Sequence, residues 1–218
     1  LAFQQTTVDL EKNESQTAIF VVPTDGSQPP RQLTSSLKKD SRPRFSPDGK
    51  YLVFQSNRSG SMPLWLIGLH GGEARQLTSL STEASNAIWS PDGRKLAFVS
   101  SVRPEYSEKP FTESDLANRE ANELAAKNTP SARIFQRLFY RHWDSYVDGK
   151  RQHLMVIRLR PGANGLEVDG TPHDATPGDR DAFPTSSTSI ARLLFVSAAV
   201  AEKAVILINP RLAKKADI

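Results

Sequence analysis

The tetrapeptide Ser46-Pro47-Asp48-Gly49 occurs a second time in this chain, as Ser90-Pro91-Asp92-Gly93. A second motif, Arg31-Gln32-Leu33-Thr34-Ser35, recurs as Arg75-Gln76-Leu77-Thr78-Ser79. Both motifs recur after the same 44 positions, so the chain contains an internal repeat. A period of about 40–50 residues is typical of the blades of a β-propeller.

The residues around each tetrapeptide are those of a tight turn between short strands. Proline presets one backbone angle of a turn, and Asp-Gly supplies hydrogen bonds and a positive φ angle. Strand-forming runs follow at Tyr51-Leu52-Val53-Phe54 and Leu64-Trp65-Leu66-Ile67. Four short strands per unit predict four-stranded antiparallel blades. We interpret the aromatic residues before the two turns, Phe45 and Trp89, as wedges between neighbouring blades.

The chain is therefore predicted to be all-β, with a helical insertion in one blade. The expected repeat units are 1–34, 35–78, 79–176 with the insertion at 103–137, and an irregular 177–218.

The two ends of the chain match the middle of a unit. Leu1-Ala2-Phe3 matches Leu96-Ala97-Phe98, and Arg192–Ser197 matches Lys95–Ser100 without a preceding Ser-Pro-Asp-Gly. Closed propellers typically have about 4–8 blades. We therefore expect an incomplete propeller here, whose missing blades lie outside this chain.

The unit aromatic-Ser-Pro-Asp-Gly, followed by Arg-Gln-Leu-Thr, resembles the TolB-type, WD-like propeller repeat. Two further segments, Val8–Asn13 and Leu138–Leu154, resemble the N-terminal propeller of bacterial prolyl oligopeptidase family serine peptidases of the acylaminoacyl-peptidase and dipeptidyl-peptidase type. In that family the propeller covers a C-terminal α/β-hydrolase domain, which carries a Ser-Asp-His triad, and restricts access to peptides. The resemblance thus implies a gating propeller whose partners are that domain and peptide substrates.

Catalytic motifs are absent from the sequence. It contains no Gly-x-Ser-x-Gly elbow, no His-Glu-x-x-His and no Walker-type loop. With no cysteine it has no disulfide and no thiol nucleophile. We expect any triad to lie beyond residue 218.

Composition bears on the partners. The net charge of +4 is spread along the chain and gives no argument for nucleic acid. The most apolar stretch, 193–208, is interrupted by Glu202 and Lys203, so no membrane span is predicted. The compartment is left open, with a periplasmic or secreted location preferred to the cytoplasm.

A helix is predicted within the insertion. Thr112 or Ser114 is expected to cap it, Asp115 to lie in its first turn and Pro130 to bar its continuation. Its apolar residues have helical spacing: Leu116, Ala117, Ala121, Leu124 and Ala125.

The helix carries two candidate site residues, Glu120 and Glu123. Some dipeptidyl-peptidase-like relatives hold the substrate's ammonium group with acidic residues on such a helix. Here the two are three positions apart rather than adjacent, so we prefer a solvated helix face.

The densest polar and aromatic cluster is Arg141, His142, Trp143 and Asp144. One interpretation is a strand end, with Trp143 packed between blades and Arg141 paired with Asp144. The other is a contact with peptide or with the hydrolase domain. Both remain open, and the structural one is preferred.

No metal or cofactor is predicted. Asp169, Asp174, Asp179 and Asp181 do not have the spacing of a calcium loop, and the prolines among them indicate a turn-rich connector. His173 is placed in the same polar loop. The histidines offer no third metal ligand beside the possible pair His142 and His153.

Two other functions compete with the peptidase gate. A TolB-like propeller with no enzyme attached would act as a protein-interaction scaffold. A propeller lyase or glycosidase would need convergent carboxylates on the inner strands, where this sequence has apolar or small residues.

Overall fold

The computed structural model describes residues 1–127, 141–142, 145–146, 148–162 and 165–182. Strands predominate in this part of the chain, and they form antiparallel sheets. The elements are β1 (Ala2–Asp9), β2 (Glu14–Val21), β3 (Arg31–Gln32), β4 (Asp40–Phe45), β5 (Tyr51–Ser56), β6 (Leu64–Gly68), β7 (Arg75–Gln76), β8 (Ser85–Trp89), β9 (Lys95–Val102), a 3-10 helix (Pro104–Tyr106), α1 (Phe111–Lys127), β10 (Arg141–His142), β11 (Ser145–Tyr146), β12 (Arg151–Gly162) and β13 (Gly165–Asp174).

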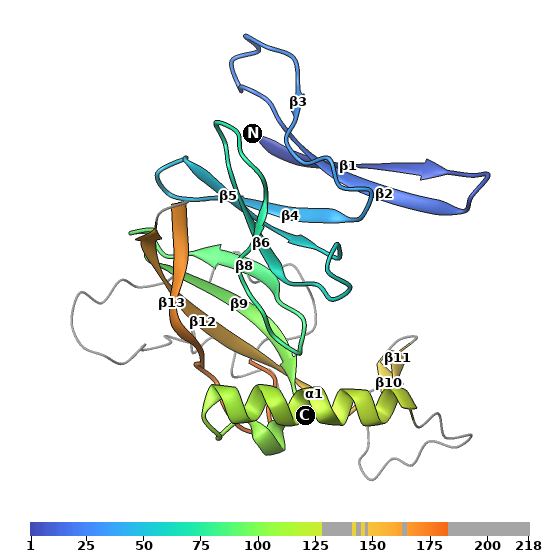
Figure 1. The fold of residues 1–218 in the computed structure, drawn as a ribbon, viewed down its shortest axis with the longest axis vertical. Coiled ribbons are helices and arrows are strands. Elements are labelled where there is room, and N and C mark those ends of the chain that lie inside the picture. Colours follow the sequence, from blue (N-terminus) through green and yellow to red (C-terminus); the bar gives the residue numbers. More distant parts are fainter. Residues whose placement is uncertain (128–140, 143–144, 147, 163–164, 183–218) are drawn as a thin grey trace, which may run out of the picture.

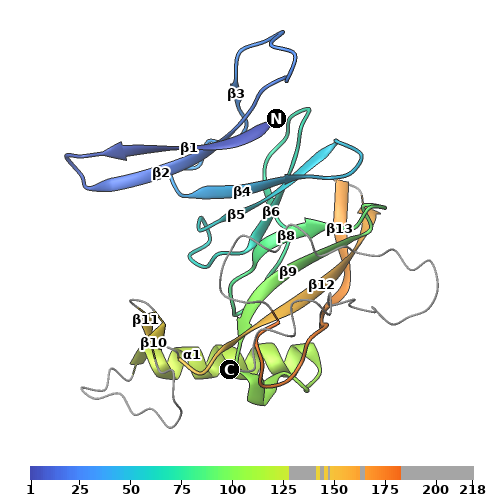
Figure 2. The same ribbon diagram turned by 180° about the vertical axis from the view of Figure 1, so that it is seen from behind.

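Three of the sheets follow one another along the molecule (Figure 1). The first has the order β1-β2-β3, the second β4-β5-β6-β7 and the third β8-β9-β12-β13. The view from behind shows the same succession, with α1 beyond the third sheet (Figure 2). The second and third sheets confirm the prediction of four-stranded antiparallel blades.

Both Ser-Pro-Asp-Gly segments form the predicted turns. In the first, Gly49 has a φ of 69° and donates its backbone N–H to the Ser46 carbonyl at 2.9 Å. The Ser46 hydroxyl donates to Asp48 Oδ1 at 2.6 Å and accepts the backbone N–H of Tyr51 at 2.9 Å. The second turn repeats these bonds with Ser90 and Asp92. The serine thus ties the turn to the strand that leaves it.

These turns make stability depend on pH. The Ser46 hydroxyl and the backbone N–H of Lys50 lower the pKa of Asp48 below its usual value of 3.8, and Ser90 acts likewise on Asp92. A carboxyl whose pKa is lower in the folded state than in the unfolded state stabilises the fold at any pH above its unfolded-state pKa. This stabilisation is lost as the pH falls through the pKa of the folded state. We expect the double variant Ser46→Ala/Ser90→Ala to lose less stability than the parent chain between about pH 5 and pH 2.

Urea unfolding at stepped pH would measure this difference, with the exposed Ser59→Ala as control. Equal acid slopes for the double variant and the parent chain would contradict the prediction.

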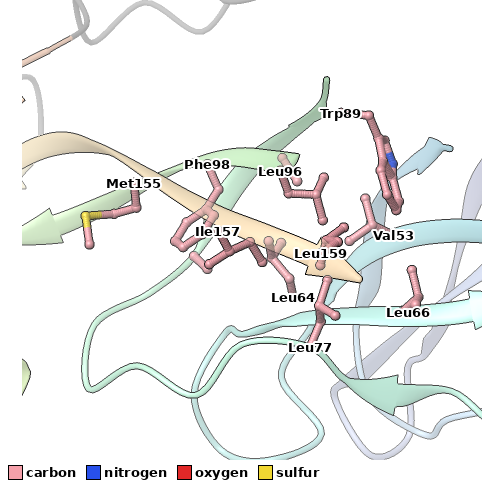
Figure 3. Close-up of a cluster of buried hydrophobic side chains, with 12 residues drawn as sticks. Val53, Leu64, Leu66, Leu77, Trp89, Leu96, Phe98, Met155, Ile157 and Leu159 are labelled. Carbon is pink, nitrogen blue, oxygen red and sulfur yellow. The ribbon is translucent and has the colours of Figure 1, made fainter. Parts of the chain in front are cut away.

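The second sheet is buried on both faces. Val53 points into a cluster shared with the third sheet, whereas Leu52 and Phe54 join Ile19 of the first sheet. Residues 51–54 of β5 are therefore apolar without alternation, as expected for a sheet packed between two others. Figure 3 shows the larger cluster, with members from the second and third sheets: Val53, Leu64, Leu66, Leu77, Ala84, Ala87, Trp89, Leu96, Phe98, Met155, Ile157 and Leu159.

The predicted aromatic wedges differ from each other. Trp89 is only 9% exposed and donates its indole N–H to the Arg44 carbonyl at 3.2 Å, so it does join neighbouring sheets. Phe45 lines a hollow together with Val21 of the first sheet, but at 40% exposed it fills the space between the sheets less completely than Trp89 does. Trp89 packs against β4, the first strand of the sheet before its own. The described part of the first sheet has no strand that corresponds to β4, so Phe45 has no such strand to pack against.

The repeat extends to details of the backbone. Arg42 and Asn86, 44 positions apart, both have a φ of 54°, and each lies in a bulge of the first strand of its sheet. The Arg42 guanidinium donates to the Asn86 side chain, which joins the two bulges. Thr34 accepts the backbone N–H of Ile19 at 3.0 Å in the first sheet. Thr78 does the same for Leu64 at 2.9 Å in the second sheet.

The bounds of the four predicted units stay a prediction. The matched segment Arg192–Ser197 lies outside the described residues. Among the helices that are described, none is long and apolar enough to cross a membrane.

Candidate functional site

The insertion carries the helix α1, which begins at Phe111. The Pro110 carbonyl accepts the backbone N–H groups of Glu113 and Ser114, each at 3.0 Å. The predicted caps were therefore wrong, because Thr112 and Ser114 lie inside the first turn. Proline has no N–H to lose and fits immediately before a helix.

Polar side chains dock α1 on the third sheet. Asn118, the buried residue of the helix, accepts the backbone N–H of Arg103 at 2.9 Å. Asp115 Oδ1 accepts the backbone N–H of Ser81 at 2.7 Å, and the Asp115 carbonyl accepts the Ser81 hydroxyl at 2.9 Å. Asp115 thus fastens the helix to the loop before β8; its predicted place in the first turn is wrong, because the helix begins at Phe111 and the acidic residue of the first turn is Glu113.

The two leucines that indicated the helix do not hold it in place. Leu116 is 51% exposed and Leu124 is 61% exposed. The spacing predicted the helix correctly, but the side of the helix that faces the third sheet is the one that carries Phe111, Ser114 and Asn118.

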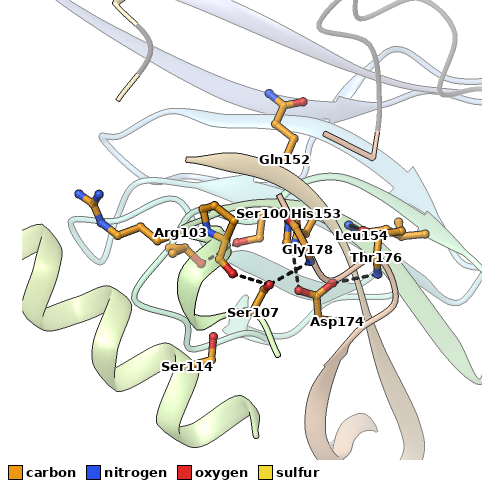
Figure 4. Close-up of polar contacts among 12 residues, drawn as sticks. Ser100, Arg103, Ser107, Ser114, Gln152, His153, Leu154, Asp174, Thr176 and Gly178 are labelled. Carbon is orange, nitrogen blue, oxygen red and sulfur yellow. Dashed lines mark hydrogen bonds and ion pairs between the residues drawn. The ribbon is translucent and has the colours of Figure 1, made fainter. Parts of the chain in front are cut away.

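A cavity of about 470 Å³ lies between α1 and the third sheet. This is within the usual size range of ligand sites, about 300–1,000 Å³. Ser114 points from the helix toward Ser107 and Asp174 on the opposite wall (Figure 4). The wall residues include apolar, hydroxyl and charged side chains: Leu80, Thr82, Val102, Ser107, Glu108, Lys109, Pro110, Phe111, Ser114, Asp115, Asn118, Met155, Pro172, His173, Asp174 and Pro177.

The wall opposite α1 rests on a buried histidine. His153 is fully buried; its Nδ1 lies 2.6 Å from Asp174 Oδ2 and its Nε2 lies 3.0 Å from the Gly178 carbonyl. The Gly178 N–H in turn donates to the Ser107 hydroxyl at 3.0 Å (Figure 4). This chain of contacts joins β12, the end of β13 and the 3-10 helix, so the cavity wall is preorganised.

Thr176 shows that this wall is part of the repeat. Its hydroxyl accepts the backbone N–H of Leu154 at 2.9 Å, as Thr34 and Thr78 do in the other sheets. Gln32 and Gln76, two positions before those threonines, each donate to the threonine carbonyl. In the third sheet Asp174 occupies this position and contacts His153 instead. This pair was not predicted from the sequence, although the register of the repeat places Asp174 at the position of Gln32 and Gln76.

The segment with the four aspartates was predicted to be a loop, and this is wrong for its first part, which is a strand. Asp169 and Asp174 lie on β13, and so does His173, which pairs with Val156. Asp181 accepts the backbone N–H of Gln152 at 2.8 Å, and Asp179 pairs with the Arg151 guanidinium at 2.9 Å.

The candidate residues of the sequence analysis fall in two places. Glu120 and Glu123 are exposed on α1, on the side away from the cavity. Arg141 and His142 form β10, which pairs with β11 so that Arg141 is opposite Tyr146 and His142 opposite Ser145. Trp143 and Asp144 lie outside the described residues. The roles of all six stay predictions, and neither Glu120 nor Glu123 is among the described residues that line the cavity.

Metal binding finds no support in the described part of the chain. There, no group of three or more histidine, aspartate or glutamate side chains is arranged to hold a metal ion.

Known proteins resemble this chain in sequence and in fold. A family model described as the TolB beta propeller domain matches residues 4–132, more than half of the chain. The Tol-Pal system protein TolB of Bordetella pertussis is 39% identical over 56 residues, covering 26% of this chain and 13% of that protein. The chain thus spans a small part of the length of this curated relative.

Solved structures of acylaminoacyl peptidases share the fold. The Pyrococcus horikoshii enzyme has a TM-score of 0.51 at 18% identity, covering 79% of this chain and 23% of that chain. An acylaminoacyl peptidase in complex with Z-Gly-Gly-Phe-chloromethyl ketone has a TM-score of 0.50 at 19% identity, covering 72% of this chain and 21% of that chain. At this identity the likeness shows the propeller fold and no more.

Proposed function

This chain belongs to the TolB beta propeller domain family, and we propose that it is the non-catalytic propeller part of a prolyl oligopeptidase family serine peptidase, whose propeller the segments Val8–Asn13 and Leu138–Leu154 resemble. In this role it gates the access of peptides to a C-terminal α/β-hydrolase domain. The partners are that domain and peptide substrates, and the triad belongs to the hydrolase domain. The sequence supports this division, because it has no nucleophile elbow of its own.

The observation that carries the proposal is the excursion between β9 and β12. In the second sheet the two middle strands, β5 and β6, are joined by the short segment 57–63. In the third sheet the corresponding strands are separated by 103–150, which includes α1. Long loops on a rigid scaffold commonly carry binding sites.

The cavity beneath α1 suits part of a peptide. Leu80, Val102, Phe111 and Met155 offer apolar surface to a side chain. The Ser114 hydroxyl, which points into the same space, can hydrogen-bond to a backbone amide (Figure 4). A mostly apolar pocket with a few placed polar groups is the usual form of a small-ligand site.

The protein encoded by the full-length gene provides the test. A fluorophosphonate probe is expected to label one serine outside this chain. Ser114→Trp would fill the cavity, and we expect it to raise KM for oligopeptides about tenfold while hydrolysis of a small ester changes less than about twofold. Thr112→Trp, on the exposed side of the same helix, is the matched control. If the probe labels a serine but Ser114→Trp has no effect on KM, the peptidase proposal stands and the role of the cavity in gating is refuted.

A second function is favoured by the local likeness to TolB from Bordetella pertussis. As a TolB-like propeller, the protein would be an interaction scaffold with no enzyme attached. Failure of the probe to label the full-length product, together with capture of a specific protein partner, would support this alternative over the peptidase.

A further inference from the structure

The outer side of α1 carries five residues in one row: Glu113, Leu116, Glu120, Leu124 and Lys127. Their spacings of three, four, four and three positions place them on one face of an α-helix. All five are exposed. We call this row the outer stripe of α1.

The outer stripe is turned away from the rest of the described chain. Phe111, Ser114 and Asn118 line the cavity on the inner side of the helix, and the stripe lies on the opposite side. Neither Leu116 nor Leu124 belongs to the buried clusters formed by the described residues. Leu116 and Leu124 lie two turns apart on one helix face, and because each is more than half exposed, both are available to a partner.

The residue types along the stripe follow the same order in both chain directions, except that the acid at one end is replaced by a base at the other. Leu116 and Leu124 lie four positions before and after Glu120. Glu113 and Lys127 lie seven positions before and after it, and their charges are opposite. Two antiparallel copies related by a two-fold axis at Glu120 would therefore place leucine on leucine and Glu113 beside Lys127 of the other copy.

From this complementarity we propose that the outer stripe binds the outer stripe of a second copy of this chain. Leucine contacts would supply apolar burial, and two symmetric ion pairs would fix the antiparallel direction. A contact between single helices is smaller than the standard interface of about 1,200–2,000 Å², so the association is weak and concentration-dependent. The proposal does not rest on the peptidase function.

Glu120 makes the proposal specific to one register. On the two-fold axis it faces its own copy, and like charges in contact weaken the pair. Replacing it with glutamine should therefore strengthen association, an effect that a partner of other sequence has no reason to show.

Sedimentation velocity of the chain at concentrations on the order of 10–500 µM would test the pairing. We expect Leu116→Asp to abolish self-association and Glu113→Lys to weaken it about five- to tenfold. Adding Lys127→Glu to Glu113→Lys should restore it, because the charges are then exchanged and still complementary. Glu120→Gln should tighten it about threefold or more.

Leu37→Asp is the control, since Leu37 is an exposed leucine outside the helix. Circular dichroism would verify that each variant is folded. A monomeric parent chain over the whole concentration range would overturn the proposal. So would a dimer that is insensitive to Leu116→Asp, or a charge-exchanged double variant as weak as Glu113→Lys alone.

Discussion

Replacing Arg58 with alanine is expected to lower the free energy of unfolding by about 3–5 kcal/mol, the usual cost of leaving a buried charge unpaired. Arg58 donates to Asp40 Oδ2 at 2.6 Å, and the Asp40 side chain is fully buried. The guanidinium also lies 4.7 Å from the ring centroid of Trp65. Ser36 donates to the same carboxylate oxygen at 2.9 Å, but it brings no charge.

Urea unfolding of the chain would measure this loss. Lys12→Ala is the control, because Lys12 pairs with Asp9 at 3.5 Å with both side chains exposed, and its loss should cost less than about 1 kcal/mol. Adding Asp40→Ala to Arg58→Ala should recover part of the loss, since the unpaired carboxylate is then gone. Strict additivity of the two single substitutions would show that the pair is not coupled.

Replacing His153 with alanine is expected to cost about 2–4 kcal/mol, the sum of a small buried cavity and lost hydrogen bonds. Both ring nitrogens have partners, Asp174 and the Gly178 carbonyl, and the ring is fully buried. The substitution leaves the Asp174 carboxyl and the Gly178 carbonyl without this buried partner. Hydrogen exchange of the segment 174–181 should accelerate more than exchange in β5.

His70→Ala controls for the removal of an imidazole, because His70 is exposed in a turn. It should change stability by less than about 0.5 kcal/mol. Equal losses for the two alanine variants, or an unchanged exchange rate for 174–181, would contradict the role given to His153.

Much of the scaffold could be predicted because the repeat is local. Ser46 and Asp48 make their bonds within a few positions, so their sequence carries the turn with it. The strands follow from β-forming residues on either side of that turn. The helix α1 was predicted from the spacing of its apolar residues together with cap candidates and Pro130, but its first residue was not, because Pro110 replaced the expected cap.

The candidate site was predicted much less well, because its contacts join distant segments. Asp115 meets Ser81 from 34 positions away, and His153 meets Gly178 from 25. Helical spacing identifies an apolar row, but the polar docking of Asn118 turned that row outward. Phe45 and Trp89 occupy the same position of the repeat, and only the neighbouring sheet made one of them buried.

The sequence by itself determined that this protein is a stack of blade-like sheets, because turn chemistry and strand propensity act over a few residues and recur every 44 positions. The tertiary structure alone decided which face of α1 is free, where the cavity lies and which polar groups build its wall. Those features depend on which surfaces compete for burial once the sheets have packed, and that competition has no local signature in the sequence.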